Sequence, residues 1–189
     1  MSYLPVCRPH GMARPGVDED TVYSGHKRFH GLKYQSVMVP CGIIVDLHGA
    51  YPGGRHDSMC LEWSELSTAL QEVNAHVPED LYLYGDSAYS AARYVLTAYG
   101  AGATPVQRAW NKQMNAVRTS VEWGFAKIVQ HFAYFQCGSQ MKLLQQPLGH
   151  MYNCAALMTN VHTLLYGGDT TESFFSCEPP FDLEWYLTV

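Results

Sequence analysis

The sequence predicts an α/β fold, and two patterns support this prediction. Short apolar runs typical of strands are followed by apolar residues at three- and four-residue steps, which are typical of amphipathic helices. The expected order is strand, strand, helix, strand, short elements, long helix and helix. A chain of 189 residues with 47% hydrophobic and 15% charged residues is long and apolar enough for one globular domain with a buried core.

We expect the chain to begin with a loop and to continue into a β-hairpin. Residues 1–22 are rich in Pro, Gly, Arg and Asp, a composition that is typical of loops. Residues 32–39 and 43–48 have strand composition, and the step from Pro40 to Gly42 between them predicts a turn. The two runs therefore predict a pair of antiparallel strands.

A helix and a short strand are expected next. The helix is predicted to begin near Asp57 or Ser58, because either side chain is a suitable N-cap, and to run toward Val73. The apolar run at residues 81–84 then predicts a strand, which ends at the following Gly-Asp step.

Two long helices dominate the expected second half of the chain. Residues 111–135 and 148–165 have helical periodicity, whereas we expect only a short helix at 93–99 and a short strand at 104–107. The tail from Gly167 is acidic and aromatic, which predicts an irregular strap. The first long helix carries an apolar stripe formed by Val117, Val121, Phe125, Ile128 and Phe132.

Composition narrows the possible functions. The formal net charge is −5, so we expect any contact with nucleic acid to be local, assisted by metal or helped by a partner. The six cysteines include no Cys-x-x-Cys pair, which argues against a zinc site. No apolar run resembles a signal peptide or a membrane span. We therefore expect a reducing intracellular compartment and no membrane partner.

Two carboxylates stand at positions that catalysis can use. Asp86 directly follows a predicted strand, where ligands bind in open α/β sheets, although the commoner role of such an Asp is to open a turn. Glu122 lies on the long helix, at the border of its apolar stripe. Taken alone, Glu122 is explained better by pairing with Arg118, one turn earlier, than by catalysis.

The loop from Gly53 to Ser58 carries further candidate residues. Asp57 is expected to cap the following helix. Arg55 and His56 are either neighbours of an active site or ordinary loop residues, and the sequence does not decide between these alternatives.

The strongest basic cluster lies at residues 23–30. His26 and His30 have a spacing that suits a metal only on a helix, and the adjacent glycines argue against a helix. Lys27 and Arg28 are better placed to contact the phosphates of DNA, with a solvated loop as the alternative.

Five segments, in order along the chain, carry a family resemblance. They are CRPHG (7–11), YSGHKRFHGLKYQSVMVPCGII (23–44), GGRHDS (53–58), LYGDSAY (83–89) and VRTSVEWGF (117–125). Together with the tail at 177–187, they resemble the DDE endonuclease domain of the PIF/Harbinger class of transposases and of the nucleases derived from them. The resemblance covers almost the whole chain.

The resemblance implies a fold and a reaction. The family is expected to have an RNase H-like fold, with a mixed central sheet flanked by helices, and three carboxylates that bind Mg²⁺ or Mn²⁺ for phosphodiester cleavage in DNA. The second Asp of the family matches Asp86, and the Glu on its long helix matches Glu122. The endonuclease domain is expected at 23–166, after an N-terminal segment (1–22) and before a C-terminal tail (167–189).

The first Asp of the family has no counterpart in the sequence. Aligned on the Cys-Arg-Pro step at residues 7–9, it falls immediately before Met1. We therefore expect the first central strand to be missing, two strand edges to be unpaired, and metal binding and cleavage to be weak or absent. A non-enzymatic DNA- or protein-binding module and a transposon relic are the alternatives to a nuclease.

The resemblance also implies partners. Related transposases are thought to rely on a separate Myb-like DNA-binding protein, so DNA and a Myb-like partner are expected. An oligomer is compatible with the sequence. The DNA substrate alone points to the nucleus.

Overall fold

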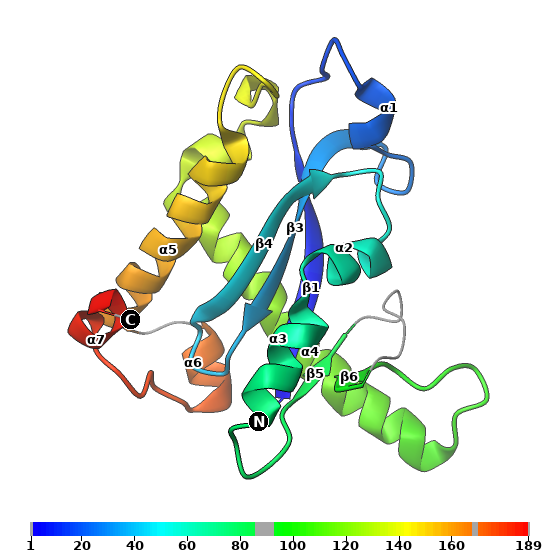
Figure 1. The fold of residues 1–189 in the computed structure, drawn as a ribbon, viewed down its shortest axis with the longest axis vertical. Helices are drawn as coiled ribbons and strands as arrows, with labels where there is room; N and C mark the ends of the chain where they lie inside the picture. The colour runs from blue at the N-terminus through cyan, green and yellow to red at the C-terminus, as the bar shows by residue number, and fades with distance from the viewer. Residues whose placement is uncertain (1, 86–92, 168–169, 189) are drawn as a thin grey trace.

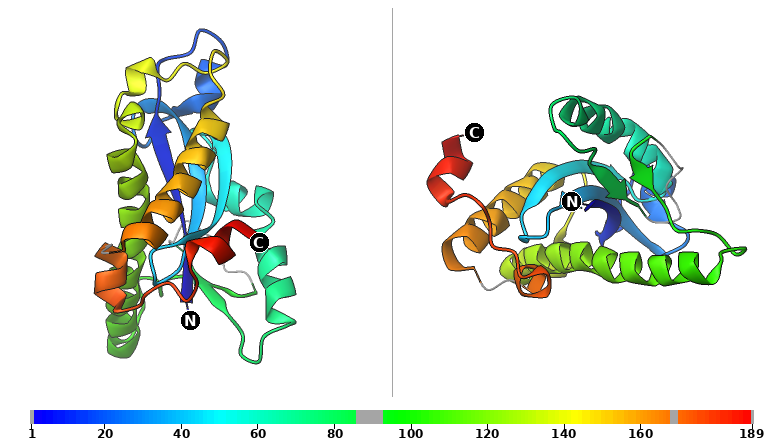
Figure 2. Two further views of the ribbon diagram at one scale, coloured as in Figure 1. Left: turned by 90° about the vertical axis from the view of Figure 1, so that its left-hand side faces the viewer. Right: turned by 90° about the horizontal axis from the view of Figure 1, so that it is seen from below.

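The computed structural model describes residues 2–85, 93–167 and 170–188 of the chain. In this part, one mixed β-sheet separates two layers of helices, as Figures 1 and 2 show. The fold is therefore α/β, as the sequence predicts. No helix of the described part is long and apolar enough to cross a membrane.

The sheet is arranged around its first strand. Its strands are β1 (Ser2–Gly11), β2 (Tyr23–Ser24), β3 (Phe29–Met38), β4 (Ile44–Pro52), β5 (Tyr82–Tyr84) and β6 (Val95–Leu96). β1 pairs with β3 in antiparallel orientation and with β5 in parallel orientation. β4 and β2 are antiparallel to β3, and β6 is parallel to β5. β1 thus joins an antiparallel half of the sheet to a parallel half.

The presence of β1 corrects two expectations, that the first central strand is missing and that residues 1–22 form a loop. Residues 2–11 are a strand, and it fills the gap between β3 and β5 that was expected to leave two edges unpaired. Pro5 and Pro9 are four residues apart, so their backbone nitrogens point to the same edge of the strand. Only one edge of β1 is paired along residues 4–11 in the described part, so two residues without an N–H can be accommodated there.

The expected hairpin is confirmed as β3 and β4, and the strand expected at 81–84 is confirmed as β5. The helix expected at 93–99 is wrong, because part of this segment is strand β6. The Leu83 N–H donates to the Tyr94 carbonyl, and the Gly85 N–H donates to the Leu96 carbonyl, each at 2.8 Å. This pairing with a distant segment outweighs a weak local preference for helix.

The helices form two layers. They are α1 (Glu19–Val22), α2 (Asp57–Trp63), α3 (Leu66–Asn74), α4 (Pro105–His131), α5 (Leu148–Tyr166), α6 (Thr170–Phe175) and α7 (Leu183–Thr188), with 3₁₀ turns η1 (Ala133–Gln136) and η2 (Gly138–Gln140). α4 and α5 cover one face of the sheet, and α2 and α3 cover the other (Figure 2). The two long helices are confirmed as α4 and α5.

Three expectations about the helices need correction. The single helix expected between residues 57 and 73 is two helices, because Glu65 adopts a left-handed conformation with φ 52° and ends the first one. The strand expected at 104–107 is wrong, because α4 begins at Pro105. The tail from Gly167 includes α6 and α7 and is not wholly irregular.

A capping box explains the early start of α4. The Thr104 Oγ1 accepts a hydrogen bond from the Gln107 N–H at 3.3 Å, and the Gln107 Oε1 accepts one from the Thr104 N–H at 2.8 Å. Pro105 occupies the first helical position, where its missing N–H costs nothing. The beginning of α4 is therefore fixed by local interactions.

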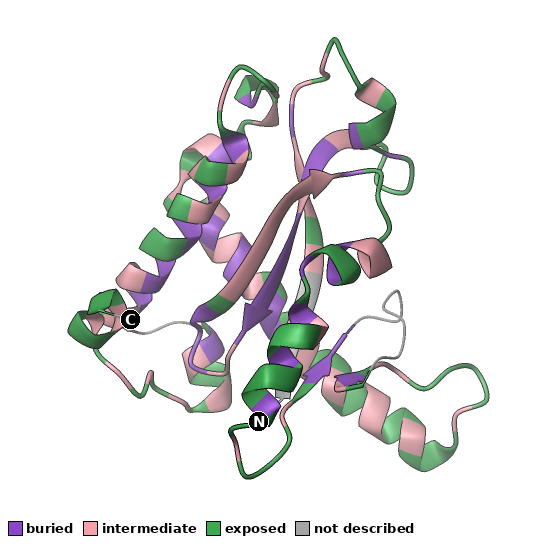
Figure 3. Ribbon diagram, viewed as in Figure 1, coloured by how far each residue is buried: buried purple, intermediate pink, exposed green. Residues whose placement is uncertain are grey.

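The larger of two cores lies between the sheet and the α4–α5 layer. As the periodicity predicts, Val121, Phe125 and Ile128 of α4 are buried, each at most 3% exposed (Figure 3). The smaller core lies under α2 and α3 and consists of Val37, Leu61, Leu66, Leu70, Leu83 and Val95.

A buried amide fixes α5 to the first residue of β4. Asn160 is 2% exposed, and its Oδ1 accepts from the Ile44 N–H at 3.0 Å. Its Nδ2 donates to the Ile44 carbonyl at 2.8 Å. Both backbone groups of Ile44 that point away from the sheet are thus satisfied by one side chain.

Replacing this amide is expected to destabilise the protein. Asn160→Ala leaves a buried N–H and C=O of Ile44 without partners, which we expect to lower the free energy of unfolding by about 2–4 kcal/mol. Urea denaturation of the variant measures this loss. Gln113→Ala, at an exposed position of α4, is the control and should change stability by less than about 0.5 kcal/mol. Equal stability of Asn160→Ala and the control would contradict the assignment.

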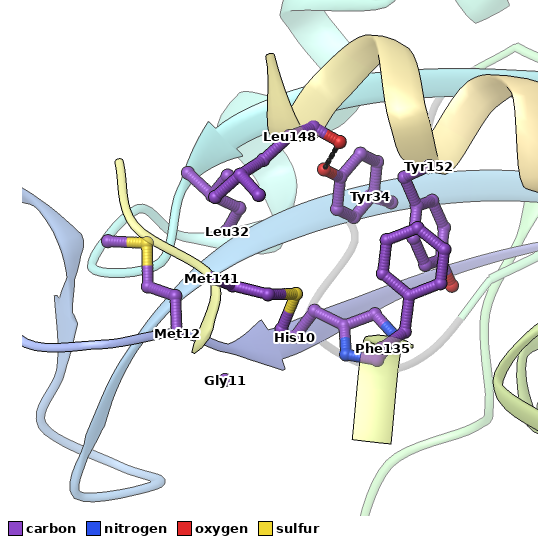
Figure 4. A pocket seen from close by; sticks show the side chains of 9 residues that line it. All are labelled: His10, Gly11, Met12, Leu32, Tyr34, Phe135, Met141, Leu148 and Tyr152. Carbon is purple, nitrogen blue, oxygen red and sulfur yellow. Dashed lines mark hydrogen bonds between the residues drawn. The ribbon is translucent and has the colours of Figure 1, made fainter. Parts of the chain in front are cut away.

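His10 of β1 lines a small apolar cavity beneath the N-terminus of α5 (Figure 4). The cavity holds about 10 Å³, barely the space of one water molecule, so it is no substrate site. The His10 ring lies 5.0 Å from the Tyr152 ring and 5.9 Å from the Phe135 ring. Burial, assisted by the nearby charge of Arg8, lowers the pKa of His10 to about 4.

The lowered pKa predicts a loss of stability in mild acid. The ordinary pKa of His is about 6.5. Between pH 6.5 and about 4, His10 is therefore protonated in the unfolded chain but neutral in the folded protein, so the free energy of unfolding falls as the pH drops through this range. The loss should be on the order of 2 kcal/mol by pH 5. His10→Phe, which keeps an aromatic ring but cannot titrate, should lose correspondingly less between pH 7 and pH 5 in thermal melts. Parallel losses in both proteins would refute this role of His10.

Candidate active site

Glu122 lies on the solvent side of α4, where the helix passes the central strand. Its side chain is 48% exposed, and its Oε1 lies 3.5 Å from the Arg118 Nη1 one turn earlier. The expected pairing with Arg118 is therefore confirmed, but the contact is long and open to water. Such a pair contributes little to stability, so the carboxylate remains available as an oxygen ligand.

Arg8 of β1 connects the central strand to the turn of α4 that carries Glu122. Its Nη1 donates to the Glu122 carbonyl at 3.4 Å. Side chains alternate along a strand, so Arg8 and His10 face the α4–α5 layer, while Cys7 faces the other side of the sheet, where its Sγ lies 3.8 Å from the Gln35 Oε1. Sequence reasoning did not assign Arg8 a role, although it stands in the Cys-Arg-Pro motif.

The strand that precedes Asp86 also packs against α4. The ring of Tyr84, the last residue of β5, lies 5.3 Å from the ring of Trp110 of α4 in an edge-to-face arrangement. The backbone of Gly85 still pairs with Leu96 of β6. Asp86 itself lies outside the described residues. Its role as a metal ligand therefore stays a prediction.

Asp57 lies in the other layer, and its expected role as a helix N-cap is wrong. It is the first residue of α2 and follows the N-cap His56, and its carboxylate accepts from the Lys33 Nζ at 2.7 Å. Lys33 also donates to the Arg55 carbonyl. The charge of Lys33, which is only 12% exposed, gives the Asp57 carboxylate a stronger partner than a backbone N–H.

The structure therefore does not bring the 53–58 loop together with Glu122. Arg55 and His56 are exposed, and the Arg55 guanidinium lies 5.9 Å from the centre of the Trp63 ring of α2. α2 and α4 cover opposite faces of the sheet (Figure 2). Any part that these residues play in catalysis stays a prediction.

Lys27 and Arg28 lie in the exposed turn between β2 and β3. Arg28 adopts φ 58°, and its N–H donates to the Ser24 carbonyl at 2.7 Å, which closes the turn. The segment around His26 and His30 is thus not a helix, and the His30 Nε2 instead lies 3.1 Å from Glu19 Oε1. Contact between this turn and DNA stays a prediction.

Two glycines let the 53–58 loop pack closely against α1, β2 and β3. A Cβ on Gly53 would lie 2.5 Å from the Gly31 carbonyl oxygen and 2.8 Å from the Val22 carbonyl oxygen. A Cβ on Gly54 would lie 2.9 Å from the carbonyl oxygens of Thr21 and Tyr23. The motif therefore has a structural explanation in close backbone packing.

The described residues do not assemble a metal site by themselves. No group of three or more His, Cys, Asp or Glu side chains in residues 2–85, 93–167 and 170–188 is placed to hold a metal ion. Glu122 has the donor chemistry that Mg²⁺ and Mn²⁺ prefer, and its carboxylate is accessible. It fits such an ion as one ligand of a set that needs further carboxylates.

Comparison with known proteins defines the family. The model of the DDE superfamily endonuclease family matches residues 5–160, and the chain belongs to this family. It is similar to the protein named "Putative nuclease HARBI1" in three mammals. Identity is 27% over 104 residues for Rattus norvegicus, covering 55% of this chain and 29% of the relative. It is 24% for Bos taurus and 25% for Homo sapiens, each over 157 residues, covering 82% of this chain and 44% of the relative.

These matches confirm the family that the sequence motifs resemble. The chain spans less than half the length of the curated relatives it matches. No solved structure matches the chain.

The packing of Gly53 predicts a marked effect of a single methyl group. Gly53→Ala forces the loop away from the carbonyl oxygens of Gly31 and Val22, and we expect this to destabilise the protein by about 1–3 kcal/mol. Gly16→Ala is the matched control, because a Cβ on Gly16 meets nothing within 4 Å. Chemical denaturation of both variants checks the prediction, and equal midpoints would disprove it.

Proposed function

We propose that this chain is a metal-dependent nuclease domain for phosphodiester bonds in DNA, that Asp86 and Glu122 are among its metal-binding carboxylates, and that its cleavage is weak because only two of the family's three carboxylates have a match in the sequence. The position of Glu122 carries the proposal. Its carboxylate is exposed on a long, well-capped helix that Arg8 joins to the central strand, within the segment that matches the endonuclease family. Family membership implies a divalent metal, for which Mg²⁺ or Mn²⁺ is the expected ion.

The strand order supports an RNase H-like fold for the domain. In such sheets the first strand lies in the middle, between a hairpin and the strand that precedes the second catalytic Asp. Here β1 lies between the β3–β4 hairpin and β5, and Asp86 follows β5 after one residue. The boundaries at residues 22 and 166 stay predictions, and the pairing of β1 favours including residues 1–22 in the domain.

The described side chains have different roles at this site. A bound divalent ion would polarise the phosphodiester and lower the pKa of an attacking water. Glu122 would supply an oxygen ligand, and Arg8 would hold the backbone of that helical turn in place. Arg118 keeps a cation beside the carboxylate, which reduces the repulsion between Glu122 and an approaching phosphate.

A non-enzymatic DNA- or protein-binding module is the second candidate. The observation that favours it is the formal net charge of −5, because proteins that bind nucleic acid over a wide surface are usually basic. DNA and a Myb-like protein are the partners that we propose for either function, and the nucleus is the compartment where this DNA would be met.

Metal binding at Glu122 tests the nuclease proposal. Titration of Mn²⁺ into the chain, followed by electron paramagnetic resonance of the free ion, should show a site whose affinity falls in Glu122→Gln. Loss of a direct ligand should cost more than the roughly 10- to 100-fold that outer partners of metal ligands contribute. Nicking of supercoiled plasmid in Mn²⁺ should fall in parallel.

Glu184→Gln, an exposed carboxylate on α7, provides the control for the change in charge. It should bind Mn²⁺ and nick DNA as the unmodified chain does. If Glu122→Gln binds Mn²⁺ as tightly as this control, the nuclease proposal is refuted. Glu122-dependent metal binding without any nicking would favour the binding module.

A further inference from the structure

Charge is distributed unevenly along the chain. The whole sequence holds 17 acidic and 12 basic side chains, yet residues 87–168 contain only one carboxylate, Glu122. The basic side chains of this segment are Arg93, Arg108, Lys112, Arg118, Lys127 and Lys142. A chain with a net charge of −5 thus contains a positively charged segment, and four of its six basic side chains lie on α4.

One face of α4 concentrates this charge in line with Glu122. Arg108, Lys112, Asn115 and Thr119 follow each other at steps of four, three and four residues, and the next step of three reaches Glu122. All five are exposed. At about 100° per residue, the first four lie on the side of α4 away from its buried stripe, and Glu122 lies at the border of that stripe, so the five form one row that is open to solvent. We name this row the α4 stripe.

The α4 stripe is accessible and has the length of a DNA contact. The first half of α4 extends past the edge of the sheet, and much of its surface there is exposed (Figures 1 and 3). The 14 residue steps from Arg108 to Glu122 span roughly 21 Å at about 1.5 Å per residue. Successive nucleotides of one strand advance by about 3.4 Å along duplex DNA, so the stripe matches about six base pairs.

Local interactions hold the stripe rigid. The capping box fixes the start of the helix, and the Arg108 Nη1 donates to the Ala103 carbonyl at 2.7 Å. Asn111 binds the backbone of Tyr99 through both its amide atoms, at 3.0 and 2.9 Å. The segment leading into α4 is therefore fastened to the helix, and little order would have to be gained when a ligand binds.

We propose that the α4 stripe is the track along which the phosphate backbone of duplex DNA reaches Glu122. Two cations separated by one helical turn neutralise phosphates, and the uncharged Asn115 amide donates hydrogen bonds to the DNA backbone nearer the carboxylate, whereas the Thr119 hydroxyl donates to the Asn115 carbonyl at 3.0 Å and leaves a small polar surface there. The inference rests on the proposed nuclease function and identifies its DNA-binding surface. It places the main phosphate contacts on α4, whereas the sequence motifs point to Lys27 and Arg28.

Salt-dependent DNA binding tests the track. Fluorescence anisotropy of a labelled 20-base-pair duplex is measured with the 189-residue chain in EDTA, so that cleavage cannot occur, between 50 and 200 mM salt. Arg108→Gln combined with Lys112→Gln should weaken binding at 50 mM salt by about tenfold or more. The slope of log K against log salt should fall in magnitude by about 2, because two phosphate contacts are lost.

A double control separates contact from general charge. Arg14→Gln combined with Lys142→Gln also removes two positive charges, but at exposed positions outside α4. This variant should leave the slope of log K against log salt unchanged. Thermal melts of both double variants establish that they fold. Equal losses in the two double variants, or no binding of the duplex by the unmodified chain at 50 mM salt, would overturn the track.

The two proposals can fail separately. Mn²⁺ binding at Glu122 is measured without DNA. If Mn²⁺ binding depends on Glu122 but the α4 double variant binds DNA as tightly as the unmodified chain, only the track is refuted. DNA binding that depends on Arg108 and Lys112, in a chain whose Mn²⁺ binding does not depend on Glu122, supports the track and counts against the nuclease.

Discussion

The pairing of β1 with both β3 and β5 is the constraint on which the rest of the structure depends. β1 is hydrogen-bonded to the antiparallel strand β3 over residues 4–11 and to the parallel strand β5 at residues 2–3. It is thus the link between the hairpin and the strand that leads to Asp86. Its side chains also alternate between the two helical layers, with Cys7 toward α2 and α3 and Arg8 toward α4. One strand therefore sets the position of the sheet halves and of the helix that carries Glu122.

The sequence predicts those parts of the fold in which local pattern and burial agree. The hairpin β3–β4 and the helices α4 and α5 are long, periodic and buried on one side, so their periodicity identifies them. The sequence does not predict β1, because Pro5 and Pro9 are typical of loops. A strand can contain both prolines only because β1 is paired along a single edge at these positions. β6 has two residues and exists through its bonds to β5, which no local pattern can reveal.

Of two other differences between expectation and structure, one has a local cause in the sequence and the other depends on packing. The capping box at Thr104 and Gln107, with Pro105 between them, is a readable signal for the start of α4, and it outweighs the strand tendency of a short segment. The left-handed conformation of Glu65, by contrast, is unfavourable for a residue with a side chain and is imposed by packing. Leu61, Leu66 and Leu70 all reach the smaller core only because the helix breaks between α2 and α3.

The candidate site shows the same division between local and long-range information. The border position of Glu122 follows from the helical periodicity alone, and its pairing with Arg118 follows from their spacing. The contact of Arg8 with that turn depends on how α4 lies across β1, so only the folded structure reveals it. Conversely, the 53–58 loop is a prominent motif whose glycines, Lys33 and Asp57 are accounted for by packing on the opposite side of the sheet.

A negatively charged protein can bind DNA in this way because charge acts over short distances in salt. At 0.1 M salt the screening length is about 10 Å, so a phosphate on the α4 stripe is influenced mainly by the side chains of α4 itself. The acidic residues Glu62, Glu65 and Glu72 lie on or next to α2 and α3, across the sheet from α4. Between Asp86 and residue 168, Glu122 is the only acidic residue in the sequence. Because the other charged residues of this segment are basic, they reduce the repulsion between Glu122 and an approaching phosphate, while Glu122 can still bind a cation together with further carboxylates such as Asp86.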